Sequence, residues 1–218
     1  MKYDLYVITS SELSRGRDTL EVVQAALAGG ATIIQLREKN WPARKLVEVG
    51  KEIRRLTQKA GAGFIVNDRL DVALALEADG VHIGQEDLPV DVARKLLGPD
   101  KILGVSVGSV EEAKEAVAQG ADYLGVGSIF ATTSKADAGP PVGVELIRQI
   151  KREIDVPVVG IGGINLSNAA QVIEAGADGV AVISAVVSSE DIESAARALL
   201  KVIQATKAKL SYPVKLKA

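Results

Sequence analysis

The residues best suited to bind an anion follow a short apolar run at 32–36. Arg37 and Lys39 lie within three positions at the edge of that run, together with Gln35 and Glu38. A guanidinium donates two parallel hydrogen bonds to a phosphate, and an ammonium supplies a compact charge. The pair is therefore suited to a phosphate or diphosphate. The alternative is that both cations belong to a solvated strand end.

Two aspartates could hold a metal ion. Asp68 follows Asn67 after the apolar run 63–66, and Asp87 follows the run 80–83. The ends of adjacent parallel strands lie roughly 4.8 Å apart, so carboxylates there can share one hard cation. Mg²⁺ typically takes one or two carboxylates plus substrate phosphates. Helix capping is the alternative role for each aspartate, because each precedes a helical stretch.

Hydroxyl groups and glycines supply a second candidate anion site. The long loop between Gly127 and Gly143 carries Thr132-Thr133-Ser134-Lys135, which could close on an anionic group; a solvated loop is the alternative. Residues 160–163 read Gly-Ile-Gly-Gly, and such a turn can bind phosphate through its backbone N–H groups. The segment lacks the Gly-x-Gly-x-x-Gly spacing of a dinucleotide site, which argues against NAD.

Composition excludes several classes of function. The 218 residues include no cysteine and one histidine, His82, which excludes Cys-ligated zinc, thiolate catalysis and a multi-histidine metal site within one chain. His82 lies in an apolar strand pattern and is expected to be a hydrogen-bonded barrel residue. A formal charge of −2 argues against a nucleic-acid partner. No stretch reaches the length of a membrane span, so we expect a cytoplasmic protein without a membrane partner.

Eight apolar runs rich in β-branched residues alternate with helical stretches. The expected strands are Leu5–Thr9, Thr32–Leu36, Gly63–Val66, Gly80–Ile83, Ile102–Val105, Tyr123–Val126, Val158–Ile161 and Gly179–Ile183. This α/β pattern predicts a single-domain TIM (β/α)₈ barrel over residues 1–218, with 208–218 as a C-terminal extension. An open doubly wound sheet is the alternative. In a barrel, functional residues lie at the C-terminal ends of the strands, so the candidates above would share one face.

Turns of related sequence precede several of these strands. Gln-Gly-Ala-Asp at 119–122 and Ala-Gly-Ala-Asp at 175–178 each stand where a helix must end and a strand begin, and Glu-Ala-Asp-Gly at 77–80 is a looser version. Glycine is favoured just beyond a helix end. We interpret these turns as an internal repeat of the fold and not as a site.

The ordered motifs of the chain resemble those of the thiamine-phosphate synthase (thiamine-phosphate pyrophosphorylase) family. The motifs are Gln35-Leu36-Arg37-Glu38-Lys39, Asn67-Asp68, the segment Asp79–Pro89, the Thr-Ser-Lys loop, Ile161-Gly162-Gly163-Ile164 and Val182-Ile183-Ser184. The resemblance implies a TIM barrel that condenses 4-amino-2-methyl-5-(diphosphooxymethyl)pyrimidine with 4-methyl-5-(2-phosphooxyethyl)thiazole. The products would be thiamine phosphate and diphosphate, with Mg²⁺ as cofactor and two phosphorylated small molecules as partners.

The resemblance also implies roles for individual residues. Arg37, Lys39 and Lys135 would be catalytic, and the pyrimidine diphosphate would contact Gln35, Leu36, Arg37, Glu38, Lys39, Asn67, Ser106 and Lys135. The thiazole phosphate would contact Thr132, Thr133, Ser134, Gly163, Ile183 and Ser184, and Mg²⁺ would bind Asp68 and Asp87. The family loop usually reads Thr-x-Thr-Lys, whereas Ser134 here keeps the hydroxyl and lacks the methyl group. A homo-oligomer is a further possibility.

Two other functions are compatible with the same barrel. A thiazole tautomerase-like relative would move protons and would need no diphosphate site. A non-catalytic phosphate-ligand-binding barrel could keep the glycine-rich turn while losing its acidic metal ligands. The presence of Lys39, Asn67, Asp68, Asp87 and Lys135 argues against the tautomerase, and the two aspartates argue against the non-catalytic barrel.

Overall fold

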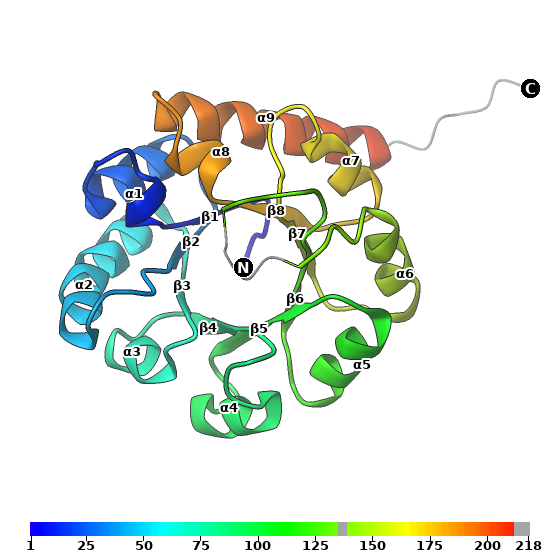
Figure 1. Cartoon of the computed structure of the whole chain (residues 1–218), viewed down its shortest axis with the longest axis horizontal. Coiled ribbons are helices and arrows are strands. Elements are labelled where there is room, and N and C mark those ends of the chain that lie inside the picture. The colour runs from blue at the N-terminus through cyan, green and yellow to red at the C-terminus, as the bar shows by residue number, and fades with distance from the viewer. Residues whose placement is uncertain (135–138, 212–218) are drawn as a thin grey trace, which may run out of the picture.

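The computed structural model describes residues 1–134 and 139–211, and this part of the chain forms a closed barrel of parallel strands. The strands are β1 (Leu5–Ile8), β2 (Ile33–Leu36), β3 (Gly63–Asn67), β4 (Gly80–Ile83), β5 (Ile102–Val107), β6 (Tyr123–Val126), β7 (Val158–Ile161) and β8 (Gly179–Val182). They pair in chain order, and β8 closes on β1 (Figure 1). The predicted TIM barrel is confirmed, and the open doubly wound sheet is wrong.

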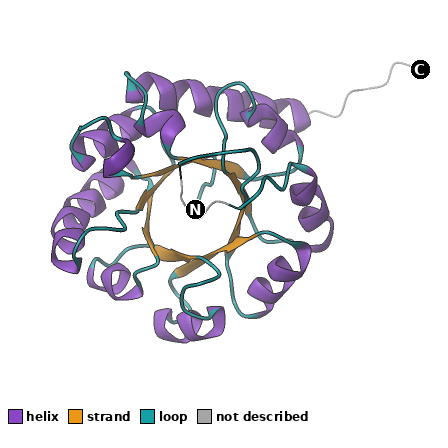
Figure 2. Cartoon of the chain, in the orientation of Figure 1, coloured by secondary structure: helices purple, strands orange, loops and turns teal. Residues whose placement is uncertain are grey.

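Helices surround the strand ring on all sides (Figure 2). They are α1 (Thr19–Ala28), α2 (Ala43–Ala60), α3 (Leu70–Ala75), α4 (Val90–Leu97), α5 (Val110–Ala118), α6 (Glu145–Glu153), α7 (Ala169–Glu174), α8 (Ser184–Val187) and α9 (Ile192–Ser211), with a short 3₁₀ helix η1 (Ser11–Leu13) after β1. Residues 208–211 were expected to begin an extension, but they continue α9 to Ser211. Residues 212–218 lie outside the described part.

The strand boundaries agree with the sequence prediction to within two residues. The largest difference is in β5, which continues to Val107 because Val107 still pairs with Val126 of β6. This places Ser106 inside β5, and β3 likewise includes Asn67. Both residues therefore belong to rigid strand ends rather than to loops.

The repeated aspartates stabilise the end of the barrel where the strands begin. Their carboxylates accept backbone N–H groups of neighbouring strands: Asp79 from Phe64 at 2.8 Å, Asp122 from Leu103 at 2.7 Å and Asp178 from Val158 at 2.8 Å. A hydrogen bond to a charged group contributes about 1.5–3 kcal/mol. Each carboxylate also pairs with a basic side chain, from Arg54, Arg94 and Lys151 respectively. These turns are thus part of the fold, as interpreted from the sequence.

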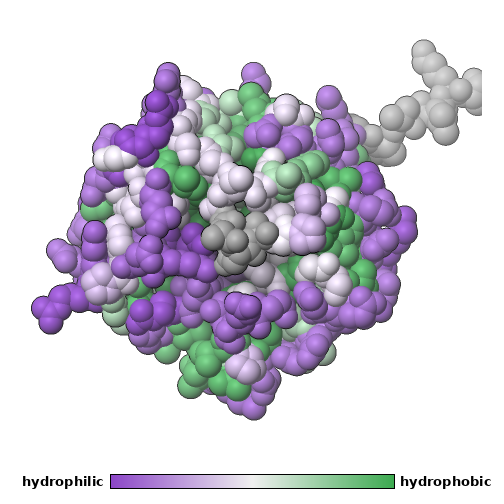
Figure 3. Space-filling view, in the orientation of Figure 1, coloured by the Kyte–Doolittle hydropathy of each residue, from purple (hydrophilic) through white to green (hydrophobic). Residues whose placement is uncertain are grey.

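Part of the outer surface over α4 is hydrophobic. Figure 3 shows hydrophobic residues gathered over α4, where Leu88, Val92 and Leu96 are exposed. Within residues 1–134 and 139–211, no helix has the length and apolar character needed to cross a membrane.

Candidate functional site

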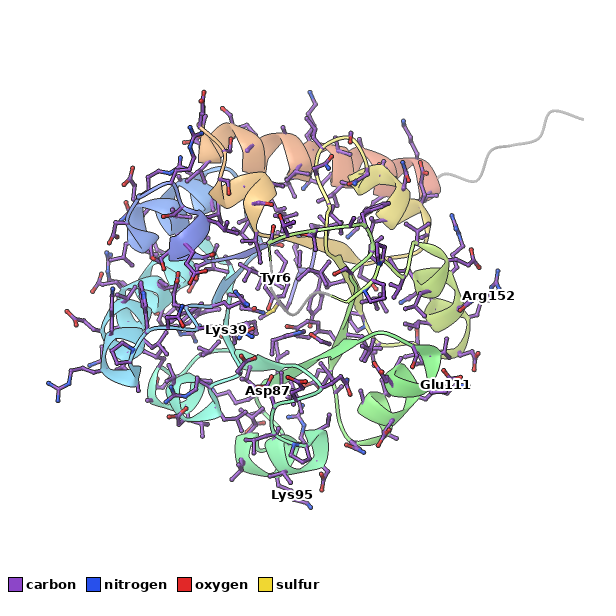
Figure 4. All side chains as sticks on the ribbon, viewed as in Figure 1. Tyr6, Lys39, Asp87, Lys95, Glu111 and Arg152 are labelled. Carbon is purple, nitrogen blue, oxygen red and sulfur yellow. The ribbon has the colours of Figure 1, made fainter. Side chains whose placement is uncertain are left out.

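A cavity of about 1050 Å³ opens at the end of the barrel where the strands finish. Its walls come from the segments after β2, β4, β6, β7 and β8 and from the end of β5. Figure 4 shows Lys39 and Asp87 on the inner side of the helix ring, whereas Lys95, Glu111 and Arg152 lie on its outside. This is the face on which barrels place their functional residues.

Many of the candidate residues line this one space. They are Lys39, Asp87, Ser106, Thr132, Thr133, Ser134, Gly163, Ile183 and Ser184. The set includes members of both anion sites expected from the sequence. Because both groups adjoin a single cavity, two bound molecules there would be neighbours.

Neither candidate metal ligand caps a helix. Helix α3 has Arg69 at its N-cap position and α4 has Pro89, and neither helix end receives a side-chain cap. Asp87 instead accepts the backbone N–H of Gly84 at 2.7 Å, within its own turn. Asp68 adopts a left-handed backbone conformation with φ of 59°, which is uncommon for a non-glycine residue. The capping alternative is therefore wrong for both aspartates.

The two carboxyl groups interact with each other. The pKa of Asp68 is raised from 3.8 to about 6, first by burial and then by a hydrogen bond with Asp87 and the charge of Asp87, while the charges of Lys39 and Arg37 act in the opposite direction. Two carboxylates this close cannot both ionise without cost. The pair together with two nearby cations is an arrangement that suits a charged ligand, and it also places Arg37 close to the site.

Two candidate side chains at the end of β2 and just after it do not line the cavity. Leu36 is almost completely buried, and Glu38 is 7% exposed. The Glu38 carboxylate accepts the backbone N–H of Ser11 at 2.9 Å and the hydroxyl of Ser11 at 2.7 Å. Any contact that Leu36 makes with a substrate would use its backbone, and Glu38 fixes η1 against the segment that carries Arg37 and Lys39.

The opposite wall of the cavity is built from hydroxyl groups. The Oγ atoms of Ser134 and Ser184 lie 2.9 Å apart and connect the loop after β6 to the turn after β8. The backbone N–H of Ser134 donates to Oγ1 of Thr132 at 3.2 Å. Lys135, the remaining candidate in this loop, lies outside the described residues.

The glycine turn after β7 allows the loop after β6 to pass close to it. Gly163 has φ of 64°, and a Cβ atom there would lie 2.5 Å from the carbonyl oxygen of Ala131. The backbone N–H of Phe130 donates to the carbonyl of Gly162 at 3.0 Å. A side chain at Gly163 would therefore displace the loop that carries Thr132 and Ser134.

A row of polar side chains, not expected from any sequence motif, lies beneath this cavity. The row joins Gln35, Tyr6, Tyr123, His82 and Ser106 by successive contacts of 2.7, 2.9, 2.8 and 2.9 Å. His82 is thus a hydrogen-bonded barrel residue, as expected. In the sequence, these five polar or aromatic residues lie within or directly beside five separate apolar runs. No local pattern indicates that they meet.

Comparisons with known proteins agree with the resemblance drawn from the motifs. A family model described as thiamine monophosphate synthase matches residues 5–186. A thiamine-phosphate synthase from Moorella thermoacetica is 64% identical over 95% of this chain and 99% of its own, and one from Chloroflexus aurantiacus is 54% identical over 94% of each chain. A solved thiamine phosphate pyrophosphorylase from Pyrococcus furiosus superposes with a TM-score of 0.87 at 49% identity, covering 93% of this chain and 96% of that one.

Proposed function

The chain belongs to the thiamine monophosphate synthase family and catalyses that family's reaction, and we propose that the reaction takes place in the cavity at the C-terminal ends of the strands, with Mg²⁺ as cofactor. The reaction joins the pyrimidine diphosphate to the thiazole phosphate and releases diphosphate, which makes the protein a transferase.

The observation that carries the proposed location is the shared cavity. Lys39 and Asp87 line one part of it, and Ser134, Gly163 and Ser184 line another. Holding two reactants side by side in a fixed geometry converts an encounter in solution into a unimolecular step and can supply about 7–11 kcal/mol of the barrier. A pyrimidine diphosphate at the first part and a thiazole phosphate at the second would meet in this way.

The donor set at Asp68 and Asp87 fits Mg²⁺. Carboxylate oxygens are preferred ligands of this ion, and it usually keeps positions for substrate phosphates. Among residues 1–134 and 139–211 no three His, Asp or Glu residues come together as a metal site, so a cation here would have two carboxylates and space for other oxygen atoms. When bound, Mg²⁺ would neutralise charge on the departing diphosphate.

Side chains at the rim of the barrel would bind the two substrates and stabilise the leaving group. Arg37 and Lys39 would bind the diphosphate and stabilise the negative charge that it gains as it leaves, and Lys135 would have the same role, as the resemblance implies. The hydroxyls of Ser134 and Ser184 would hold the thiazole phosphate with its ring nitrogen directed at the pyrimidine methylene. No protein nucleophile is needed, because the rate gain comes from alignment and charge stabilisation.

A coupled assay tests this function. Purified protein is incubated with both substrates, with and without Mg²⁺, and thiamine phosphate and diphosphate are quantified together. We expect equal amounts of the two products with Mg²⁺, none when either substrate is omitted, and a large loss of rate in a chelator. Full activity in the chelator would contradict the metal proposal, and absence of thiamine phosphate under every condition would contradict the function. A cytoplasmic location and a homo-oligomer stay predictions.

A further inference from the structure

Five polar side chains form a continuous hydrogen-bonded row across the barrel interior. They come from five strands: Gln35 on β2, Tyr6 on β1, Tyr123 on β6, His82 on β4 and Ser106 on β5. We call this row the relay. Figure 4 shows Tyr6 close to the middle of the barrel, between the segments that carry Lys39 and Asp87 and the opposite wall.

Each end of the relay lines a cavity. Ser106 lines the large cavity. Gln35 lines a small cavity of about 10 Å³ that shares Gly125, Ile161 and Ala181 with the large one. No described residue donates a hydrogen bond to Oε1 of Gln35. This atom is also absent from the fully buried atoms that lack a partner, so it is not completely enclosed. Ser106 therefore faces the large cavity, and Gln35 faces the small cavity that adjoins it.

The hydrogen-bond direction along the relay follows from the chemistry of its members. Nε2 of Gln35 can only donate, so the hydroxyl of Tyr6 accepts from it and gives its own single proton to the hydroxyl of Tyr123. Tyr123 in turn gives its proton to His82. The Nδ1 atom of His82 is then an acceptor.

The second half of the relay continues the same direction. Since Nδ1 of His82 accepts, the ring carries a proton at Nε2, which donates to Oγ of Ser106 at 2.9 Å. The proton of Ser106 is then left to donate into the cavity. Gln35 at the other end offers its carbonyl oxygen, which only accepts. The two ends thus have opposite and fixed hydrogen-bonding character.

Burial keeps the two phenols in the state that this direction requires. Tyr6 and Tyr123 are each 1% exposed, and burial raises the pKa of both hydroxyls above their ordinary value. Each hydroxyl therefore keeps exactly one proton to pass along the row. An unpaired polar group at this depth is costly, so each member is held to its partners.

Two strand glycines make room for the relay. A Cβ atom on Gly104 would lie 2.1 Å from Cζ of Tyr123, and one on Gly125 would lie 2.9 Å from Cε1 of His82. Neither ring could keep its place beside a larger residue. The space in which the relay lies is thus set by the sequence of β5 and β6.

We propose that Tyr6, Tyr123 and His82 are positioning residues that select an aminopyrimidine. They fix the hydrogen-bonding character at the bottom of the barrel cavity, with an acceptor at Gln35 and a donor at Ser106. This inference rests on the proposed binding of the pyrimidine at Gln35 and Ser106. In an aminopyrimidine, the amino group is a hydrogen-bond donor and the neighbouring ring nitrogen is an acceptor. The amino group complements the acceptor at Gln35, and the ring nitrogen complements the donor at Ser106. The 4-oxo analogue carries an oxygen acceptor beside a ring N–H, which is the reverse pattern.

The size of the expected selection follows from the cost of mismatched groups. A site built to hydrogen-bond a substrate group rejects an analogue with the wrong pattern, because buried polar atoms are left without partners. We expect the whole protein to prefer the aminopyrimidine diphosphate over its 4-oxo analogue by at least about 100-fold in kcat/KM. Without the relay, the Ser106 hydroxyl and the His82 ring can reverse their hydrogen bond and accept the analogue.

The test compares two tyrosine variants. Tyr123→Phe removes the hydroxyl in the middle of the relay, while Tyr3→Phe removes a hydroxyl whose ring packs 5.1 Å from that of Tyr123 but lies outside the relay. We expect Tyr123→Phe to raise the KM for the pyrimidine diphosphate, to leave the KM for the thiazole phosphate unchanged, and to reduce the preference for the aminopyrimidine about tenfold. Tyr3→Phe should keep the preference of the unchanged protein.

Three results would overturn the proposal. They are an unchanged preference in Tyr123→Phe, an equal loss in Tyr3→Phe, and a preference of the unchanged protein for the 4-oxo analogue, which would mean that the relay runs in the opposite direction. Should Tyr123→Phe fail to fold, Tyr6→Phe breaks the same row one link away and is judged by the same ratio. Absence of thiamine phosphate from the unchanged protein would contradict the proposed function instead, so the two failures are distinguishable.

Discussion

The carboxyl groups of Asp68 and Asp87 are hydrogen-bonding partners at the ends of β3 and β4, and this contact adds to burial in raising the pKa of Asp68 to about 6. Folding therefore brings together two groups that repel each other once both are ionised. Functional sites of enzymes often lower the stability of the fold. Here the loss of stability can be measured through its dependence on pH.

Replacing Asp68 with Asn should stabilise the protein at neutral pH in the absence of divalent cations. The pKa of Asp68 is raised on folding, so the stability contributed by its protonated form is fully present below about pH 3.8 and is lost as the pH rises through about 6. Asp68→Asn removes that loss. After a reduction for partial solvent exposure, we expect a gain on the order of 1 kcal/mol above pH 6, measured by urea unfolding.

The pH dependence distinguishes charge from backbone effects. Asn also tolerates the left-handed conformation of residue 68, but that gain is the same at every pH. Asp71→Asn is the control, because Arg69 lowers the pKa of this exposed carboxyl, so its removal should not stabilise the protein as the pH rises. A gain from Asp68→Asn that does not change between pH 4 and pH 7 would mean that folding does not raise the pKa of Asp68.

Asp87→Ala should reduce Mg²⁺-dependent coupling on the order of 100-fold, because the cation would lose one of its two carboxylates. Asp87 is exposed, and its carboxylate contacts only the backbone N–H of Gly84 and the carboxyl group of Asp68 among the described residues, so the melting temperature should change little. Asp91→Ala is the matched control, since Asp91 is an acid in the following helix whose partner is Lys95. Near-normal turnover of Asp87→Ala at ordinary Mg²⁺ concentrations would remove this residue from the metal site.

Ser134 and Ser184 should act as one unit in binding the thiazole phosphate. Their Oγ atoms are 2.9 Å apart, so each fixes the other's hydroxyl. We expect Ser134→Ala and Ser184→Ala each to raise the KM for the thiazole phosphate by roughly three- to tenfold, and the double variant to raise it less than the product of the two. Ser189→Ala is the control, because that hydroxyl donates to the carbonyl of Asp191. Independent effects would mean that the two hydroxyls bind separately.

Much of the fold and part of the site could be predicted because their signals are local. A run such as Gly80–Ile83 and a turn such as Ala-Gly-Ala-Asp at 175–178 can each be interpreted within a few residues, and both agree with the structure. The placement of Asp87 and Ser184 on one cavity followed from the rule that strand ends share a face.

The rest depends on contacts between distant parts of the chain. Tyr6 and Tyr123 are 117 residues apart and meet only because the barrel closes. Glu38 was expected among the substrate ligands, yet it binds Ser11, 27 residues earlier, because both flank the same rim. No pattern within either segment indicates the partner, so neither relationship could be inferred before the strand order was known.

Gly104→Ala should destabilise the barrel and weaken pyrimidine binding together. The new methyl group would lie 2.1 Å from Cζ and 2.4 Å from the hydroxyl oxygen of Tyr123, so the ring would have to move. Overpacking of this kind costs about 1–3 kcal/mol, which urea unfolding can measure. Because Tyr123 contacts His82 at 2.8 Å, its displacement should also raise the KM for the pyrimidine diphosphate but not that for the thiazole phosphate.

Gly108→Ala is the control for this variant. It lies just beyond the same strand, and its added Cβ would meet only the Glu112 carboxylate, at an ordinary contact distance of 3.7 Å. Its free energy of unfolding should change by less than about 0.5 kcal/mol. Equal stability of the two variants would show that the Tyr123 ring is not confined by Gly104. A destabilised Gly104→Ala with an unchanged pyrimidine KM would separate packing of the ring from its part in substrate binding.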